Sequence, residues 1–317
     1  MFIGIDIGGT NIKGVLTEKS GKILSFKSIP TEDKAENIEK SIYGIIETLA
    51  TSASVSKIDI KAMGVGAAGS IDRKKGTVIL SPNVKAWNNY PLVKRFEKVT
   101  GLRVFLENDA TAALVGTWWQ GPGKKYRNWL LLTLGTGIGG GVVIDNNLYT
   151  GRSGSSMEIG HMTISYDGKE CSCGNRGCLE RYASATALME YVKEHAKKHK
   201  DTTLKQHLKD DTLTAEIVYE QALGGDDLAK NAINEIATFL GIGMANLVNI
   251  FNPEAVILGG GLSGACKLLI PRIKKVVNER ALPGMKENIE YIALRDQEKF
   301  APLGAAKLAI NSLNANL

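Results

Sequence analysis

Several short runs of β-branched and leucine residues, and several longer stretches with helical periodicity, stand out along the chain. Two of the runs share one layout: residues 2–17 and 129–144 each hold an apolar strand, a glycine-rich turn and a second apolar strand. β-Branched residues resume directly after each turn, which predicts tight hairpins rather than the strand–turn–helix unit of a dinucleotide site. The pair predicts a duplicated fold whose hairpins face each other across a cleft.

Four more segments carry clear periodicity. Residues 103–113 predict a short strand that ends in a polar triplet and is followed by an alanine-rich helix. Residues 227–252 predict one long amphipathic helix, and residues 253–258 a buried strand that leads through glycines into a helix over about residues 266–280. Residues 302–310 predict a closing helix.

The glycine turns are candidate anion sites. Turns of this kind expose backbone N–H groups with no side chain in the way, and Thr10, Thr133 and Thr136 add hydroxyl donors. One such turn is explained by chain reversal alone. Two of them, with a third glycine cluster at Gly259–Gly261 that opens a helix, indicate phosphate binding.

A cysteine cluster provides the most specific signal. Cys171, Cys173 and Cys178 lie within eight positions, and His161 stands ten residues upstream. Three thiolates and one imidazole are the ligand set of a closed tetrahedral zinc site. The first two thiols are too close in sequence to pair comfortably, and Cys266 is far away, so zinc is favoured over free structural thiols or a redox site.

Polar residues near these motifs are candidates for a hydroxylated ligand. Glu158 and Glu180 flank the cysteine cluster, so a metal there would fix where both carboxylates point. Asp109, at the end of a predicted strand, reads equally as a helix cap or as a catalytic carboxylate. Residues 81–83, with Trp87 four positions on, form a polar loop whose signal is weak by itself.

Composition excludes several classes of protein. With 317 residues and 44% apolar residues, the chain can bury a large core, and its length favours two domains. Its net charge of +6 comes from scattered basic residues; the densest stretch, Lys193–Lys200, is interleaved with Glu190 and Glu194 and lacks stacking aromatics. We therefore expect no nucleic-acid partner. No apolar run reaches membrane-spanning length and Met1 leads straight into a strand, which predicts a cytoplasmic protein.

Taken together and in order, the motifs resemble those of the ROK family of sugar kinases and regulators. The matching segments cover nearly the whole chain: Asp6–Thr10, Glu107–Asp109, Leu134–Gly141, Glu158–His161 and Cys171–Glu180. The zinc loop with its upstream Glu-x-Gly-His partner is highly specific, and the glycine turns support it. The loop at residues 81–83 and the tryptophan after it look most like the glucokinase members.

The resemblance implies an actin-like (ribonuclease H-like) duplicated α/β fold with MgATP between two domains. We expect a smaller domain of residues 1–115 plus 303–317 and a larger one of residues 116–302. It also implies structural zinc, a homodimer or homotetramer, and ATP-dependent phosphorylation of a hexose at its 6-hydroxyl, most simply glucose to glucose 6-phosphate. An N-acetylhexosamine kinase is the main rival. A sugar-responsive regulator is disfavoured because the first hairpin begins at Phe2, which leaves no room for a DNA-binding segment.

The resemblance also implies roles for individual residues. Asp109 would be the general base. The sugar would be surrounded by Asn83, Asn108, Asp109, Glu158, His161 and Glu180. The nucleotide would be held by Asp6, Gly8, Gly9, Thr10, Lys13, Thr133, Gly135, Thr136, Gly137, Gly139, Gly259, Gly260 and Gly261. Zinc would be bound by His161, Cys171, Cys173 and Cys178. Met157 departs from the family, whose members often have a small residue, commonly glycine, just before this glutamate, so the expected backbone shape is in question there.

Overall fold

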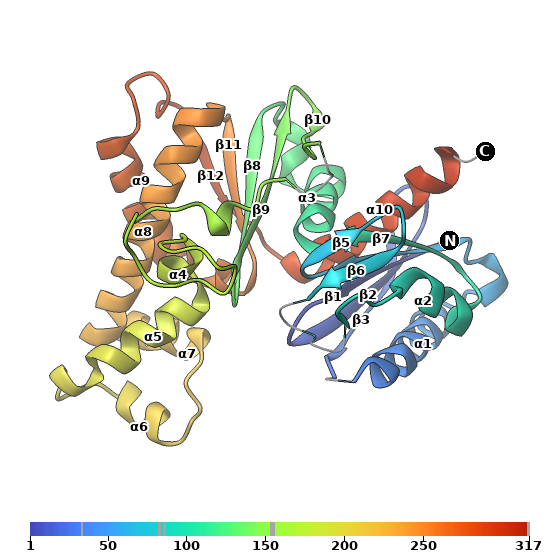
Figure 1. Cartoon of the computed structure of the whole chain (residues 1–317), viewed down its shortest axis with the longest axis horizontal. Helices are drawn as coiled ribbons and strands as arrows, with labels where there is room; N and C mark the ends of the chain where they lie inside the picture. The colour runs from blue at the N-terminus through green and yellow to red at the C-terminus, as the bar shows by residue number, and fades with distance from the viewer. Residues whose placement is uncertain (33, 82–83, 85–86, 153–155, 316–317) are drawn as a thin grey trace. The chain divides into compact units, whose positions relative to one another are not determined.

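A computed structural model gives the fold of residues 1–32, 34–81, 84, 87–152 and 156–315 (Figure 1). The chain divides into two compact units, each with a five-stranded sheet and its own apolar core. Unit 1 comprises Met1–Lys125, Thr150–Ser155 and Asp296–Leu317, and unit 2 comprises Tyr126–Tyr149 and Ser156–Arg295.

The sheet of unit 1 has the strand order β3-β2-β1-β4-β7. The first three strands form an antiparallel meander, whereas β4 and β7 run parallel to β1. The predicted first hairpin is confirmed as β1–β2. A small β5–β6 hairpin, which the sequence did not predict, follows β4. The strands are β1 (Phe2–Ile7), β2 (Asn11–Thr17), β3 (Ile23–Pro30), β4 (Ala62–Ala67), β5 (Ser70–Asp72), β6 (Thr77–Leu80) and β7 (Arg103–Asn108).

The sheet of unit 2 repeats this arrangement with the order β10-β9-β8-β11-β12. Here too an antiparallel set of three is followed by two parallel strands. The predicted second hairpin is β8–β9, and the predicted duplication is confirmed by the matching topology. The strands are β8 (Trp129–Leu134), β9 (Ile138–Ile144), β10 (Asn147–Leu148), β11 (Ala255–Gly259) and β12 (Glu290–Ala293).

Alternation along β1 sorts its side chains between the two faces of the first sheet. Ile3, Ile5 and Ile7 join the apolar cluster that contains the buried face of α1, and Phe2 packs with α10 on the other face. Asp6 therefore points to the α10 side of the sheet, the side on which α3 also packs. The helices of unit 1 are α1 (Ala35–Ser52), α2 (Leu92–Thr100), α3 (Asp109–Gln120) and α10 (Phe300–Ala315), with short 3₁₀ turns η1 (Lys57–Asp59), η3 (Pro122–Lys125) and η7 (Gln297–Lys299).

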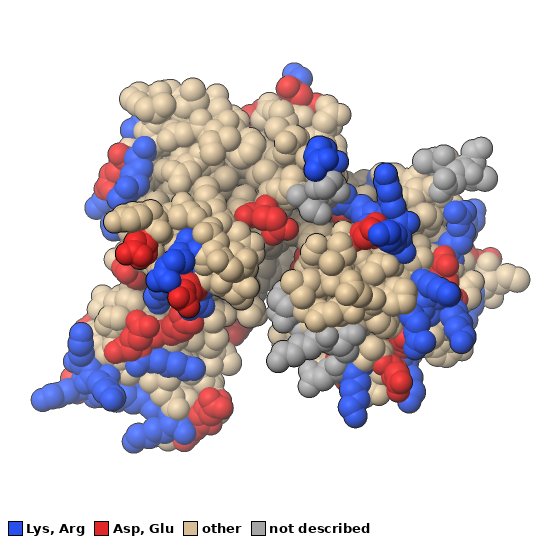
Figure 2. Space-filling view, in the orientation of Figure 1, with Lys and Arg blue, Asp and Glu red and all other residues tan. Residues whose placement is uncertain are grey.

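In unit 2, α8 and α9 pack on each other and cover one face of the second sheet (Figure 1). The predicted helices over residues 227–252 and 266–280 are confirmed. Over α5 and α6, basic side chains lie among acidic ones on the face shown in Figure 2. The helices are α4 (Glu180–Ala183), α5 (Ala185–His195), α6 (Leu204–Lys209), α7 (Ala215–Leu223), α8 (Asp227–Phe251) and α9 (Cys266–Arg280), with 3₁₀ turns η4 (Ile159–His161), η5 (Ala196–Lys198) and η6 (Gly261–Ala265).

Helix α8 departs from one expectation. It has 25 residues, and an 18-residue window within it has a mean hydropathy of 1.3, so the helix is long and apolar enough to cross a membrane, although no such run was expected from the sequence. The core helix of a folded domain has the same length and composition. In unit 2 this helix carries fully buried Leu240, Met244 and Val248 and packs against α7 and α9.

The division of the chain also differs from the expected boundaries at residues 115 and 303. Unit 1 continues through α3 to Lys125 and resumes at Asp296. The physical reason is the close packing of α3 on α10: a Cβ at Gly116 would lie 1.9 Å from the carbonyl oxygen of Phe300, and one at Gly304 would lie 1.8 Å from that of Ala112. Helices that meet backbone to backbone belong to one unit.

Candidate functional site

The first glycine turn connects β1 to β2 in unit 1. The N–H of Gly8 donates to the carbonyl of Asn11 at 3.1 Å, which closes the turn. Thr31, just after β3, braces it from outside: its hydroxyl donates to the Gly8 carbonyl at 2.7 Å and its N–H to the Thr10 carbonyl at 2.9 Å. Gly9 and Thr10 remain exposed at the tip, where their backbone is accessible to an anion.

Asp6 lies at the base of this turn, paired across the hairpin with Lys13. Its carboxyl is buried, and Gly66 of the neighbouring strand lies beside both Asp6 and Asp109. Burial, then the nearby charge of Asp109, raises the pKa of Asp6 to about 7, against the opposing effect of Lys13. The structure therefore brings together two carboxylates that lie 103 positions apart, the like-charge arrangement common at catalytic sites.

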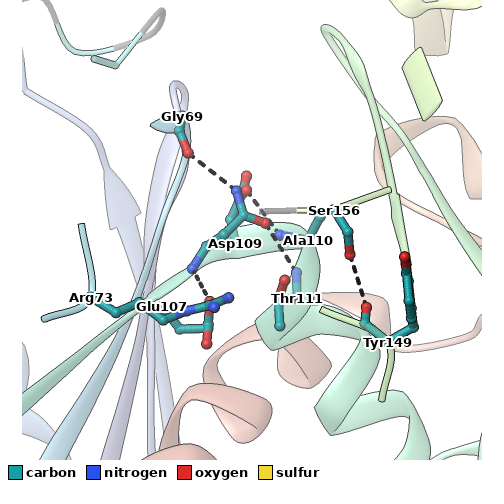
Figure 3. Close-up of polar contacts among 9 residues, drawn as sticks. Gly69, Arg73, Glu107, Asp109, Ala110, Thr111, Tyr149 and Ser156 are labelled. Carbon is teal, nitrogen blue, oxygen red and sulfur yellow. Dashed lines mark hydrogen bonds and ion pairs between the residues drawn. The ribbon is translucent and has the colours of Figure 1, made fainter. Parts of the chain in front are cut away.

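The β7–α3 junction positions Asp109. Asn108 is the N-cap of α3: its side-chain oxygen accepts from the Thr111 N–H at 3.1 Å, and its amide donates to the Gly69 carbonyl at 3.3 Å (Figure 3). The helix-cap interpretation of Asp109 is therefore wrong. Asp109 is the first helical residue, and its carboxylate accepts from the Ala110 N–H at 2.9 Å.

Arg73 and Glu107 brace the same junction from the opposite side of the strand end. Arg73 Nε donates to the buried Glu107 carboxylate at 2.7 Å, and the Asn108 N–H donates to it at 2.8 Å (Figure 3). Burial raises the pKa of Glu107 despite this ion pair. The Glu107 carboxylate thus connects Arg73, in the turn of the β5–β6 hairpin, to the backbone of Asn108.

The polar loop before Trp87 is described only in part. Asn83 and Pro82 lie outside the described residues, so the expected sugar contact of Asn83 stays a prediction. Ser81 is buried, and its hydroxyl accepts from the Val84 N–H at 3.2 Å. Trp87 is fully buried in the core, stacked on Tyr90 with ring centroids 5.6 Å apart.

In unit 2, the second glycine turn and the third glycine cluster lie at the carboxyl ends of the parallel strands β8 and β11. Thr133 pairs with Gly259 in the sheet. Gly260 has a φ of +88°, and a Cβ there would lie 2.3 Å from the carbonyl oxygen of Leu134. Only glycine permits this approach, which joins two motifs far apart in sequence at the edge where α/β sheets bind ligands.

The Glu158–His161 segment has an unusual backbone. Met157 has a φ of +64°, in the left-handed region that glycine favours. Glu158, with φ −69° and ψ 56°, is the centre of an inverse γ-turn closed by the Ile159 N–H and the Met157 carbonyl at 2.7 Å. The doubt about the local backbone at Met157 is thus answered: methionine adopts the glycine-type conformation, and the exposed Glu158 side chain leaves the turn.

The predicted zinc ligands converge. The ligand atoms of His161, Cys171, Cys173 and Cys178 all lie within 4.8 Å of one another. His161 Nδ1 is 3.6 Å from Cys171 Sγ, and the Sγ atoms of Cys173 and Cys178 are 3.7 Å apart. A Zn–S bond of about 2.3 Å gives tetrahedral S–S edges of about 3.8 Å, so these distances fit the edges of a zinc tetrahedron.

Glu180 occupies a position that the sequence did not predict. Instead of standing apart from the nucleotide motifs, its carboxylate accepts from the Ile138 N–H at 2.8 Å, at the end of the second glycine turn. Gly160, on the Glu158–His161 segment, approaches Ile138 too: a Cβ there would lie 2.1 Å from the Ile138 carbonyl oxygen. Three motifs of unit 2 therefore meet at the start of β9.

Sequence reasoning missed three residues that brace these motifs. Thr31 holds the first turn, Arg73 holds Glu107, and Thr186 donates its hydroxyl to the Thr136 carbonyl at 2.9 Å. Each contact spans more than twenty positions, and a single threonine or arginine carries no local motif. No signal in one sequence marks them.

Comparisons with known proteins agree with this arrangement. The model of the ROK family matches residues 2–312. The chain is 38% identical to a glucokinase of Thermotoga maritima over 97% of this chain and 96% of that protein. It is 32% identical to a xylose repressor of Caldicellulosiruptor bescii over 98% of this chain and 78% of that protein. A crystal structure of a ROK family glucokinase from Streptomyces griseus with glucose and AMPPNP superimposes with a TM-score of 0.84 at 35% identity, covering 98% and 99% of the two chains.

The family model spans both sheets and both glycine-rich hairpins, and the solved relative shares the fold over nearly its whole length. The chain belongs to the ROK family and has its actin-like ATPase fold.

Proposed function

We propose that this protein is an ATP-dependent sugar kinase that transfers the γ-phosphoryl group of ATP to the 6-hydroxyl of a hexose, with glucose as its main substrate. The observation that carries the proposal is the pair of close carboxylates, Asp6 and Asp109, beside the first glycine turn. The similarity to glucokinases over nearly the whole chain supports the choice of reaction and sugar.

In this proposal Asp109 is the general base. A sugar hydroxyl is a weak nucleophile, and a carboxylate that accepts its proton makes attack on the phosphorus favourable. Asp109 suits the role because the first turn of α3 fixes its backbone, and the hydrogen bond from the Ala110 N–H orients its carboxylate. Asn108 and the Arg73–Glu107 pair keep the strand end rigid.

The glycine turns hold the triphosphate. In unit 1, Gly9 and Thr10 offer backbone N–H groups, the N–H of Gly8 closes the turn, and Lys13 lies across the hairpin as a cation. In unit 2, Thr136 and Gly137 offer the same groups in the turn that Gly135 begins. Gly139 follows in β9, and Gly259–Gly261 would lie closest to the adenosine. Mg²⁺ would neutralise the charge of the triphosphate. Among the described residues, the one cluster of three or more ligating side chains is the cysteine set, so Mg²⁺ is expected to bind with the nucleotide, mainly through phosphate oxygens and water.

The sugar is recognised by Glu158, Glu180 and His161, together with Asn83 and Asn108. Fixed acceptors suit hydroxyl groups better than an acidic substrate. His161 turns Nδ1 toward Cys171, which leaves Nε2 as the ring atom for a sugar hydroxyl. The zinc would thereby set the tautomer and ring angle of a substrate ligand.

We propose that the cysteine–histidine set binds one structural Zn²⁺. All four positions of the tetrahedron are filled by protein, so none remains for substrate. Burial and the two neighbouring thiols raise the pKa of Cys178 to about 12, which makes a metal-free thiolate cluster unfavourable. A bound cation would stabilise the deprotonated ligands and the loop that carries them.

A sugar-responsive regulator is a second candidate, favoured by the 32% identity to a xylose repressor. A coupled assay of ADP formation by the purified protein with MgATP separates the candidates. The sugars to be tested are glucose, mannose, fructose, N-acetylglucosamine and N-acetylmannosamine. Turnover with glucose supports the kinase; turnover mainly with an N-acetylhexosamine would change the substrate. Tight sugar binding without ADP formation would favour the regulator. We propose that the enzyme works in the cytoplasm, where ATP and reduced thiols are available, and that it forms a homodimer or homotetramer.

A further inference from the structure

We propose that Glu180 and Thr186 are positioning residues that hold the second glycine turn, residues Leu134–Ile138, in the shape that receives the triphosphate. The inference rests on the proposed kinase function, because it assigns these two side chains to the nucleotide side of the site. It also gives Glu180 a task beyond sugar recognition.

Three contacts from one short stretch of chain reach the turn. Glu180 accepts from the Ile138 N–H at 2.8 Å. The Ala185 N–H donates to the Gly135 carbonyl at 2.8 Å, and the Thr186 hydroxyl donates to the Thr136 carbonyl at 2.9 Å. Residues 180–186 therefore fix the entry, tip and exit of the turn.

Close packing also holds Glu180 against the second glycine turn. A Cβ at Gly137 would lie 2.3 Å from a carboxylate oxygen of Glu180, so the side chain packs directly against the backbone of the turn. The turn also uses its own N–H of Gly135, which donates to the Gly137 carbonyl at 2.9 Å. Within the described part of the chain, the N–H groups of Thr136 and Gly137 have no hydrogen-bond partner, and they are the donors left for a phosphate oxygen.

The same stretch begins at the cysteine loop. Glu180 follows Cys178 by two residues, and the Arg181 N–H donates to the Cys178 carbonyl at 3.0 Å. Ser184 then caps α5 by accepting from the Ala187 N–H at 3.2 Å, which fixes where Thr186 lies. Residues 180–186 therefore connect the cysteine loop directly to the second glycine turn. A shift of the cysteine loop would move the side chains that contact the turn.

Equilibrium binding of Mg²⁺ and a non-hydrolysable ATP analogue to the full chain, without sugar, tests this inference by calorimetry. Glu180→Ala and Thr186→Val remove the contacts. Glu180→Gln keeps an oxygen for the Ile138 N–H, and Thr186→Ser keeps the hydroxyl, so both should rescue binding. Glu190→Gln, on α5 and paired with Arg181, and Thr48→Val, which loses a 2.8 Å bond to the Gly44 carbonyl in α1, are matched controls.

We expect Glu180→Ala and Thr186→Val each to raise the analogue Kd about 3- to 30-fold, the order expected for loss of one hydrogen bond that shapes a site. The rescue and control variants should stay within about twofold of wild type. Thr186→Val should leave glucose affinity unchanged, which a general loss of structure would not. Folded Glu180→Ala and Thr186→Val proteins that both bind the analogue like wild type would overturn the inference. A wild-type protein that binds no analogue would instead overturn the proposed function.

Discussion

Replacing Asp109 with asparagine should make the protein slower and more stable at the same time. The catalytic part of this prediction follows from loss of the proposed base, and kcat should fall roughly 10²- to 10⁴-fold. The fold should survive, because the cap of α3 is Asn108 and not Asp109. The gain in stability follows from removal of a charge that faces the buried Asp6.

The size of that gain can be worked from the pKa of Asp6. Its rise from 3.8 to about 7 corresponds to about 4 kcal/mol, at about 1.4 kcal/mol per pKa unit. Burial is the larger cause and Asp109 the second, so less than half, about 1–2 kcal/mol, belongs to the charge of Asp109. Folded protein holds a proton on Asp6 that the unfolded chain releases, so the free energy of unfolding should fall as pH rises from about 4 to about 7.

Urea unfolding of wild type and Asp109→Asn from pH 4 to pH 8 measures this directly. The two proteins should be nearly equal at pH 4, and the variant should become more stable by about 1–2 kcal/mol at pH 8. Asp6→Asn is the control, because it should remove most of the pH dependence. A variant that is less stable than wild type at pH 8, or one with kcat within about threefold of wild type, would refute the reasoning about this pair.

Other outcomes follow from the zinc loop and its flanking turn. Elemental analysis of protein purified without added metal should find close to one zinc per chain, and folded, active protein with titratable thiols and no zinc would contradict the assignment. Cys173→Ser should lower Tm and also raise the sugar KM, because the metal orients His161; an unchanged sugar KM at a permissive temperature would count against that coupling. Glu158→Gln should weaken sugar binding by about 1–3 kcal/mol and leave ATP affinity nearly unchanged, whereas equal losses would indicate a structural role. Met157→Gly should be more stable than Met157→Ala by about 1 kcal/mol in chemical denaturation, since only glycine adopts a φ of +64° without strain, and the opposite order would show that the turn relaxes.

Local patterns predicted the elements that depend on local physics. The glycine hairpins follow from glycines flanked by β-branched residues, and the convergence of the four candidate zinc ligands follows from their spacing. The long helix α8 and the helix α9 follow from periodicity, and their observed bounds differ from the predicted ones by at most one residue. The matching hairpins predicted the duplication, and the family resemblance added the actin-like topology, which the spacing of the motifs does not specify.

The remaining features of the site depend on contacts between residues far apart in the sequence, and no local pattern predicts such contacts. Asn108, and not Asp109, is the N-cap of α3, because the helix begins one residue earlier than the helix-cap interpretation of Asp109 requires. Glu180 reaches a turn 42 positions away, and Arg73 reaches Glu107 across 34. The boundary between the units differs from the predicted one because Gly116 of α3 and Gly304 of α10 let these two helices, which are far apart in the sequence, meet backbone to backbone.

The most direct test of the central claim is ³¹P NMR of purified protein with MgATP and glucose. We expect equimolar ADP and glucose 6-phosphate from the wild-type protein, and a large loss of both products in folded Asp109→Asn protein. Absence of a sugar phosphate despite bound glucose and nucleotide, or phosphorylation at another hydroxyl, would contradict it.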